Sequence, residues 1–148
     1  MKITHSKNKI LFVKPPDRFL EDEFVYQQLG PHYLQSFLKQ FEITSDILVL
    51  YEQSEVRKKR EKGKINELSL KQLNMLFLGA NGNSQDLDFE ISILQDYDIV
   101  ALSVMSPQAS DAYLISQLIN KLYPHITTVI GGSHPRYYKT QVESLPES

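Results

Sequence analysis

Four short runs of mainly apolar residues predict buried β-strands. They cover residues 10–13, 47–51, 99–104 and 126–130, and Pro15-Pro16 and Gly131-Gly132 follow the first and the last of them. Runs without a regular polar alternation are typical of strands that are covered on both faces, as in parallel sheets. The sequence therefore predicts a sheet of four mainly parallel strands.

Apolar residues at helical spacing lie between these runs. Residues 33–41 carry them three and four positions apart after Pro31, and a second segment of this kind begins at Pro107 and ends before Pro124. Such spacing predicts amphipathic helices. We also expect a helix over 68–78 that Gly79 ends, a turn over 80–83, the end of another helix over 89–94 and a short helix over 138–143. Residues 52–64 form either a solvated connection or an exposed helix.

Alternating strands and helices indicate the fold class. They require crossover connections and place helices on both faces of a mainly parallel sheet. We expect one α/β domain over residues 1–148, an open flavodoxin-like (Rossmann-like) three-layer sandwich. The chain stops about where a fifth strand should begin, so we expect that strand to be missing and the chain to be the N-terminal part of a longer enzyme.

Composition narrows the class of partner. The 148 residues are 41% hydrophobic and 23% charged with a net charge of −2, so no overall field recruits nucleic acid or an anionic membrane. Cysteine is absent, which excludes disulfides and thiolate-bound metals within these residues. There is no hydrophobic segment of the length of a signal peptide or a membrane span, so we expect a cytoplasmic protein.

The residues that follow the strands are the candidate site, because ligands of open α/β sheets bind beyond the carboxyl ends of the strands. The loop after the first strand lacks the glycines of a phosphate-binding loop or a dinucleotide fingerprint, and the third strand ends in Ser103, where a phosphoacceptor domain needs an aspartate. The candidate ligand-binding residues are Pro15, Pro16, Asp17, Ser103, Val104, Met105, Ser106, Gln108, Gly131, Gly132, Ser133 and His134.

Several of these features have two interpretations. Gly131-Gly132 either lets a flat group approach the backbone or only makes the turn after the strand. The basic run 57–60 either binds phosphate or is a solvated face balanced by glutamates. His134 and His32 either contact a ligand or are surface and capping residues.

Taken in order, four segments resemble the N-terminal cobalamin-binding domain of cobalamin-dependent radical SAM enzymes. They are ILFVKPP, LGPHYLQSFLKQ, DYDIVALSVMSPQ and ITTVIGGSHP, and residues 52–90 match least. In that family a serine at one strand end and a Gly-Gly at the next line the slot for the nucleotide tail of cobalamin. The resemblance implies this role for Ser103 and for Gly131-Gly132.

The resemblance also implies that this domain and a radical SAM domain have separate roles. The loop after the first strand has no histidine, unlike the Asp-x-His-x-x-Gly of cobalamin-dependent mutases, so no residue here is expected to ligate cobalt. Without cysteine the chain lacks the iron–sulfur motif of the radical SAM half. The implied function is to position cobalamin for a radical SAM methyltransferase or related enzyme, with the iron–sulfur cluster and S-adenosylmethionine held by a radical SAM domain in cis or in trans.

Two other function classes remain to be weighed. A cofactor-free docking or regulatory domain could contact a partner through an open sheet edge. A small hydrolase or transferase has no support, since no serine–histidine–acid arrangement stands at a familiar spacing. We therefore expect no catalysis from this chain alone.

Overall fold

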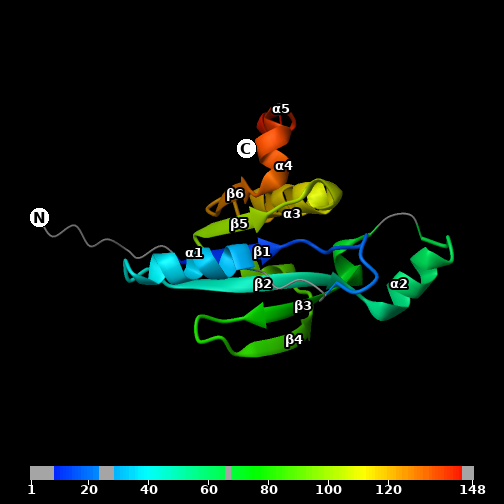
Figure 1. Ribbon diagram of the computed structural model, residues 1–148, viewed down its shortest axis with the longest axis horizontal. Helices are drawn as coiled ribbons and strands as arrows, with labels where there is room; N and C mark the ends of the chain where they lie inside the picture. The colour runs from blue at the N-terminus through cyan, green and yellow to red at the C-terminus, as the bar shows by residue number, and fades with distance from the viewer. Residues whose placement is uncertain (1–8, 24–28, 66–67, 145–148) are drawn as a thin grey trace, which may run out of the picture.

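The computed structural model describes residues 9–23, 29–65 and 68–144 and has one six-stranded sheet at its centre (Figure 1). The strand order is β4-β3-β2-β1-β5-β6. The strands are β1 (Ile10–Lys14), β2 (Ser45–Glu52), β3 (Leu73–Leu78), β4 (Ser84–Asp88), β5 (Ile99–Ser103) and β6 (Thr127–Gly131). β2, β1, β5 and β6 are parallel to one another, whereas β3 and β4 are antiparallel additions beside β2.

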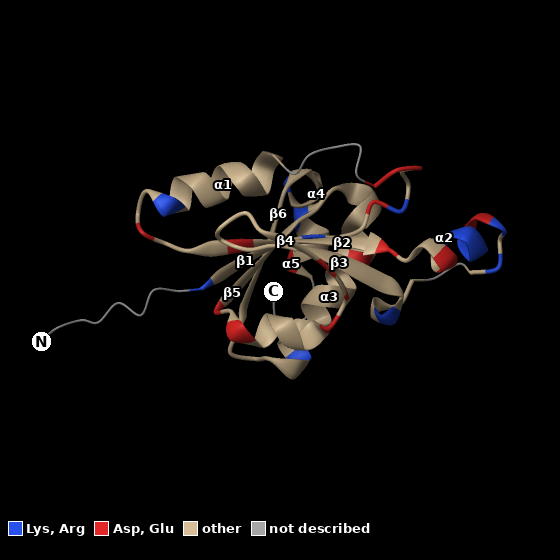
Figure 2. Ribbon diagram, turned by 90° about the horizontal axis from the view of Figure 1, so that it is seen from below, with Lys and Arg blue, Asp and Glu red and all other residues tan. Residues whose placement is uncertain are grey.

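Two main helices cover opposite faces of this sheet (Figure 2). Helix α1 (Leu29–Lys39) connects β1 to β2 on one face, and α3 (Ala109–Leu122) connects β5 to β6 on the other. The shorter helices are α2 (Ser54–Glu61), α4 (Ser133–Tyr137) and α5 (Lys139–Glu143), with 3-10 turns η1 (Leu70–Gln72), η2 (Ile91–Asp96) and η3 (Ser106–Gln108). The mixed α/β fold with a mostly parallel sheet is therefore confirmed, and it is consistent with a Rossmann-like arrangement.

The core divides between the two faces because side chains alternate along each strand. Leu11, Val13 and Leu102 face α3 and belong to the larger apolar cluster, together with Ile115 and Ile119 of that helix. Residues of opposite parity form a smaller cluster on the α1 face around Phe12, Ile47 and Val49. Strands that are buried on both faces explain the continuous apolar runs of the sequence.

The predicted helix over 68–78 is wrong. Residues 73–78 form β3, which pairs with β2 from Leu73↔Glu52 to Leu78↔Ile47. Leu73 and Met75 point into the larger cluster, while Leu76 and Leu78 pack on the smaller one. An apolar run that serves two faces can mimic helical spacing, which is why the periodicity misled the prediction. Gly79 begins the β3–β4 turn, and the predicted turn over 80–83 is confirmed.

The number of strands also differs from the prediction of four. The β3–β4 hairpin adds two, and because residues 84–88 are a strand, residues 89–94 are not the end of a helix; only the 3-10 turn η2 is present there. Within the described ranges no strand pairs with the outer edge of β6. Residues 54–61 are helical, which settles the choice left open for segment 52–64. Among the described residues no helix is long and apolar enough to cross a membrane.

Candidate functional site

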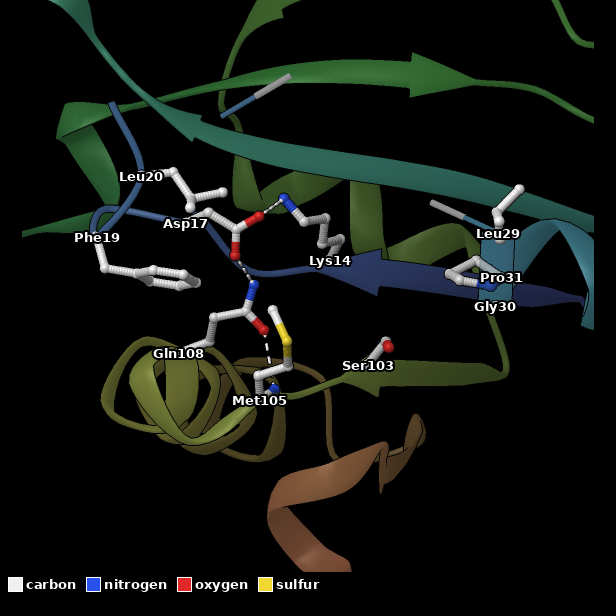
Figure 3. A pocket seen from close by; sticks show the side chains of 10 residues that line it. All are labelled: Lys14, Asp17, Phe19, Leu20, Leu29, Gly30, Pro31, Ser103, Met105 and Gln108. Atoms are coloured by element: carbon white, nitrogen blue, oxygen red, sulfur yellow. Dashed lines mark hydrogen bonds and ion pairs between the residues drawn. The ribbon is translucent and has the colours of Figure 1, made fainter. Parts of the chain in front are cut away.

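A crevice of about 550 Å³ lies at the carboxyl edge of the sheet, where the strand order reverses between β1 and β5 (Figure 3). β1 leads through α1 to β2 on one side, whereas β5 lies on its other side, so the loops after β1 and β5 diverge there. Such a reversal is the preferred ligand position of open α/β sheets. The residues that line the crevice are Lys14, Asp17, Phe19, Leu20, Leu29, Gly30, Pro31, Ser103, Met105 and Gln108.

A buried polar network forms one wall of the crevice. The Lys14 ammonium, at the end of β1, makes an ion pair with Asp17, and the other carboxylate oxygen of Asp17 accepts a hydrogen bond from the Gln108 amide. That amide also donates to the Pro15 carbonyl at 3.1 Å, and its oxygen accepts the Met105 N–H at 2.9 Å. Figure 3 shows the chain from Lys14 to Met105. Gln108 thus joins the loop after β1 to the loop after β5.

Two arginines of α2 hold the loop after β1 from behind. Arg60 makes hydrogen bonds of 2.8–3.2 Å with the Glu52 carboxylate and donates at 3.0 Å to the Arg18 carbonyl. Arg57 donates to the Leu20 carbonyl. Charge-assisted hydrogen bonds of this kind are stronger than neutral ones. Arg57 and Arg60, the two ends of the basic run 57–60, therefore have a structural role. They form neither a phosphate site nor a wholly solvated face.

The buried carboxylate of Glu23 completes this support. Its two oxygens accept the backbone N–H groups of Asp17 and Glu52, each at 3.0 Å. Burial raises the pKa of Glu23, and the two backbone hydrogen bonds and the nearby charges of Lys14 and Arg57 oppose that rise. The loop that borders the crevice is thereby attached to β2 through Glu23 as well as to the turn η3 through Gln108.

The pair Arg18–Asp111 fixes the same loop to α3 and makes stability depend on pH. The guanidinium donates to both carboxylate oxygens at 3.2 and 3.3 Å. Burial raises the pKa of Asp111, and Arg18 lowers it in part. A raised pKa means that the folded chain holds the proton more tightly than the unfolded chain. The stability contribution of Asp111 is therefore highest at low pH and falls as the pH rises through its folded-state pKa.

Removing the Arg18 guanidinium should enlarge this loss of stability with rising pH. Without Arg18 the pKa of Asp111 rises further, so we expect Arg18→Gln to lose about 1 to 3 kcal/mol at neutral pH and clearly less at about pH 4. Denaturant unfolding at the two pH values measures this difference. Lys58→Gln, which breaks an exposed ion pair with Glu55, is the control and should change stability by about 0.5 kcal/mol or less. An equal loss for Arg18→Gln at both pH values would contradict the assignment.

A second hollow, of about 340 Å³, continues from the crevice over the α1 face of the sheet. The two share Gly30 and Pro31 of α1 and Ser103 of β5. Its floor is made of neighbours in the strand register, Ser103 opposite Gly131 and Ala101 opposite Val129, and all of these except Val129 are small. The remaining walls are Phe12, Leu34, Leu102 and Gly132. We call this hollow the slot.

The two glycines after β6 have different roles. A Cβ added at Gly131 would meet nothing within 4 Å, so Gly131, which lines the slot, leaves it open on that side. A Cβ added at Gly132 would lie 2.7 Å from the carbonyl oxygen and 2.9 Å from the nitrogen of Val104, and its φ of +104° is a glycine conformation. Gly132 therefore makes the turn after β6, whereas Gly131 leaves open space at the end of that strand.

The structure brings half of the predicted site residues to the two cavities. Asp17, Ser103, Met105 and Gln108 line the crevice, and Ser103, Gly131 and Gly132 line the slot. The other six line neither cavity. Pro15, Pro16 and Val104 are buried, Ser106 and Ser133 are exposed, and His134 of α4 is buried against Tyr113 of α3.

Several lining residues were not among the predicted set. Lys14 and the residues of the first turn of α1, Leu29, Gly30 and Pro31, border the crevice, and Phe12, Leu34, Ala101 and Val129 line the slot. Gly30-Pro31 was a usable signal, because a helix that follows the first strand places its N-terminal turn at the carboxyl edge. The slot residues could be found only from the register of β5 and β6.

Metal ligation by histidine finds no support in the described residues. Of His32, His125 and His134, none lines the crevice or the slot, and no group of three or more histidine, aspartate or glutamate side chains in those ranges could hold a metal ion. His32 is exposed on α1, and both ring nitrogens of His134 are already hydrogen-bonded.

The outer face of α1 is unusually apolar for an exposed helix. Tyr33, Phe37 and Leu34, which also borders the slot, are each more than half exposed, and so is Phe41 in the turn after α1. Exposed apolar residues gathered in one place mark contact surfaces more often than residues scattered singly.

Comparisons of the chain with protein-family models, with curated protein sequences and with solved structures found no match.

Proposed function

We propose that this chain binds cobalamin, with the flat base of the nucleotide tail in the slot and the corrin across the carboxyl edge of the sheet. The observation that supports this most is the slot itself, an apolar hollow that opens into the switch-point crevice and depends on the absent side chain of Gly131. Both cavities lie within the range of about 300 to 1,000 Å³ that is usual for small-molecule sites.

The lining of the slot suits a flat aromatic base. Phe12, Leu34 and Val129 offer apolar contact, and Ala101 and Gly131 leave the sheet surface low enough for a ring to lie on it. Ser103 stands where slot and crevice meet, so its hydroxyl can hydrogen-bond a ring nitrogen or the sugar of the tail. An apolar cleft with one or two placed polar groups is the usual design of a cofactor site.

The rim of the crevice suits a large planar ring system. Phe19, Leu29 and Met105 are 51%, 58% and 44% exposed, which leaves apolar contact area at the mouth. Beneath them, Lys14, Asp17 and Gln108 form a polar floor in reach of amide side chains at the edge of a corrin. The chain would bind and orient the cofactor, while cobalamin supplies methyl transfer or electron transfer beside a radical SAM domain in cis or in trans.

Filling the slot is the direct test. We expect Gly131→Phe to weaken hydroxocobalamin binding about tenfold or more, measured by visible absorption during titration and by co-elution in gel filtration, because the ring takes the place of the base. Thr127→Phe is the matched control, since Thr127 lies on the same strand and the same face but outside the slot, and it should bind as the wild type does. A folded wild-type chain that retains no cobalamin would refute the proposal.

A second candidate, a cofactor-free docking domain, is favoured by the apolar outer face of α1. Residues 33, 34, 37 and 41 could pack on a partner domain, and the outer edge of β6 offers backbone groups to a further strand. The two candidates are separable. Phe37→Glu should abolish partner binding and leave cobalamin affinity unchanged. Gly131→Phe should weaken cobalamin binding and leave partner binding unchanged.

A further inference from the structure

The ring of His134 is fixed on every side, although His134 lines neither cavity. Its side chain is buried, Nε2 lies 2.6 Å from the Tyr113 hydroxyl of α3, and Nδ1 lies 3.1 Å from the Ser106 hydroxyl. The ring stacks on Tyr138 with centroids 4.9 Å apart, and the backbone N–H of His134 donates to the Val104 carbonyl at 3.0 Å. The Tyr113 hydroxyl, the His134 imidazole and the Ser106 hydroxyl thus form a chain from α3 through α4 to η3.

The proton positions in this chain decide what Ser106 can do. If His134 carries its proton on Nδ1, Tyr113 donates to Nε2 and Ser106 accepts from Nδ1, which leaves the serine hydrogen for another acceptor. If the proton is on Nε2, the serine hydroxyl donates to Nδ1 and its hydrogen is used. The first arrangement makes Ser106 a hydrogen-bond donor toward a ligand, and the second makes it a nucleophile activated by histidine.

The geometry favours the first arrangement. The Tyr113 phenol is a much stronger acid than the Ser106 hydroxyl, so it is the better donor to an imidazole nitrogen. The contact between Tyr113 and Nε2, at 2.6 Å, is also shorter than the 3.1 Å contact between Ser106 and Nδ1. Burial raises the pKa of Tyr113, which keeps the phenol protonated at neutral pH. Tyr113 therefore places the proton of His134 on the nitrogen that faces Ser106.

We propose that Tyr113 and His134 are positioning residues that turn the hydroxyl of Ser106, an exposed residue, into a hydrogen-bond donor for a carbonyl oxygen of the ligand. Ser106 is an exposed residue that lies along the chain between Met105 and Gln108, both of which line the crevice. The identity of the acceptor rests on the proposed function: the amide side chains at the edge of a corrin carry such carbonyls. The positioning of the proton does not rest on it.

The proton position can be tested without any ligand. In a ¹⁵N-labelled wild-type chain, imidazole nitrogen shifts and their long-range couplings to ring protons should show His134 protonated on Nδ1 and bare on Nε2. In Tyr113→Phe, which removes only the hydroxyl, the population with the proton on Nε2 should rise. A wild-type spectrum with the proton on Nε2 and a bare Nδ1 would overturn the proposal.

The donor role is tested by hydroxocobalamin titration. We expect Ser106→Ala and Tyr113→Phe each to weaken binding about three- to ten-fold, and Ser106→Thr, which keeps a hydroxyl, to retain most of the affinity. Thermal unfolding of each variant checks that the fold is kept. If the wild type binds and Ser106→Ala binds equally well, the donor role is wrong. If the wild type binds no cobalamin, the proposed function fails with it, while the spectrum still decides the proton position.

A serine-reactive probe excludes the other arrangement. A fluorophosphonate labels serines that histidine activates, so the proposed state predicts no labelling of Ser106 in the wild-type chain. Labelling that disappears in both Ser106→Ala and His134→Asn would assign Ser106 as a nucleophile and would overturn the donor role.

Discussion

Gly132→Ala should destabilise the chain by about 3 to 5 kcal/mol, a large part of the stability of an ordinary domain. Two costs add at this position. The backbone lies at φ +104° and ψ −163°, a region that only glycine occupies without strain, and the new Cβ would press on the Val104 backbone from 2.7 Å. Val104 cannot retreat, because its N–H donates to Gly131 and its carbonyl accepts from His134. Denaturant unfolding measures the loss.

Two other glycines separate these costs. Gly131→Ala adds a methyl group in open space at ordinary φ, and Gly82→Ala adds one in open space at φ +74°, so the latter carries strain without a clash. We expect Gly131→Ala to be close to neutral and Gly82→Ala to lose about 1 to 2 kcal/mol. A Gly132→Ala loss no larger than that of Gly82→Ala would show that the contact with Val104 is unimportant.

Gln108→Met should cost about 2 to 4 kcal/mol, although it keeps the length of the side chain. Gln108 is 1% exposed, and its amide satisfies the Pro15 carbonyl, the Asp17 carboxylate and the Met105 N–H at once. A thioether can replace none of these, so buried polar groups of two loops would be left without partners. Hydrogen exchange at the Met105 amide should accelerate in step with the loss of stability.

Two variants serve as controls for the Gln108→Met result, one at an exposed position and one that introduces a charge. Gln40→Met, at an exposed position after α1, should leave stability within about 0.5 kcal/mol of the wild type. Gln108→Glu keeps the acceptor for Met105 but places a second carboxylate beside Asp17, so its stability should fall as the pH rises above the usual aspartate range. A neutral Gln108→Met variant would mean that the two loops are held together by other contacts.

Local patterns predicted most of the elements, because each parallel strand contains a mainly apolar run and each main helix has its own periodicity. The failure at residues 73–78 has a physical cause: Leu73, Met75, Leu76 and Leu78 serve both faces of the sheet, and their spacing fits a helix equally well. Only the pairing of β3 with β2, a contact between distant segments, decides between the two.

The candidate site was predictable in position but not in shape. The chain order of strands and helices indicated the carboxyl edge, and Ser103 and Gly131 were identified as its residues. The slot, however, arises because Ser103 is opposite Gly131 and Ala101 is opposite Val129, and the register of two strands is not visible in either sequence segment. In the same way, Arg57 and Arg60 show their role only once α2 is placed behind the loop after β1.

The slot depends more on the small side chains of three residues than on the identity of the residues in its walls. Ala101, Ser103 and Gly131 keep it open by being small, and their backbones are held by ordinary parallel pairing. The surrounding walls are apolar contacts that many side chains of similar size can supply. Substitutions of similar size at most wall positions should therefore keep the same hollow, whereas one bulky residue at position 131 should close it.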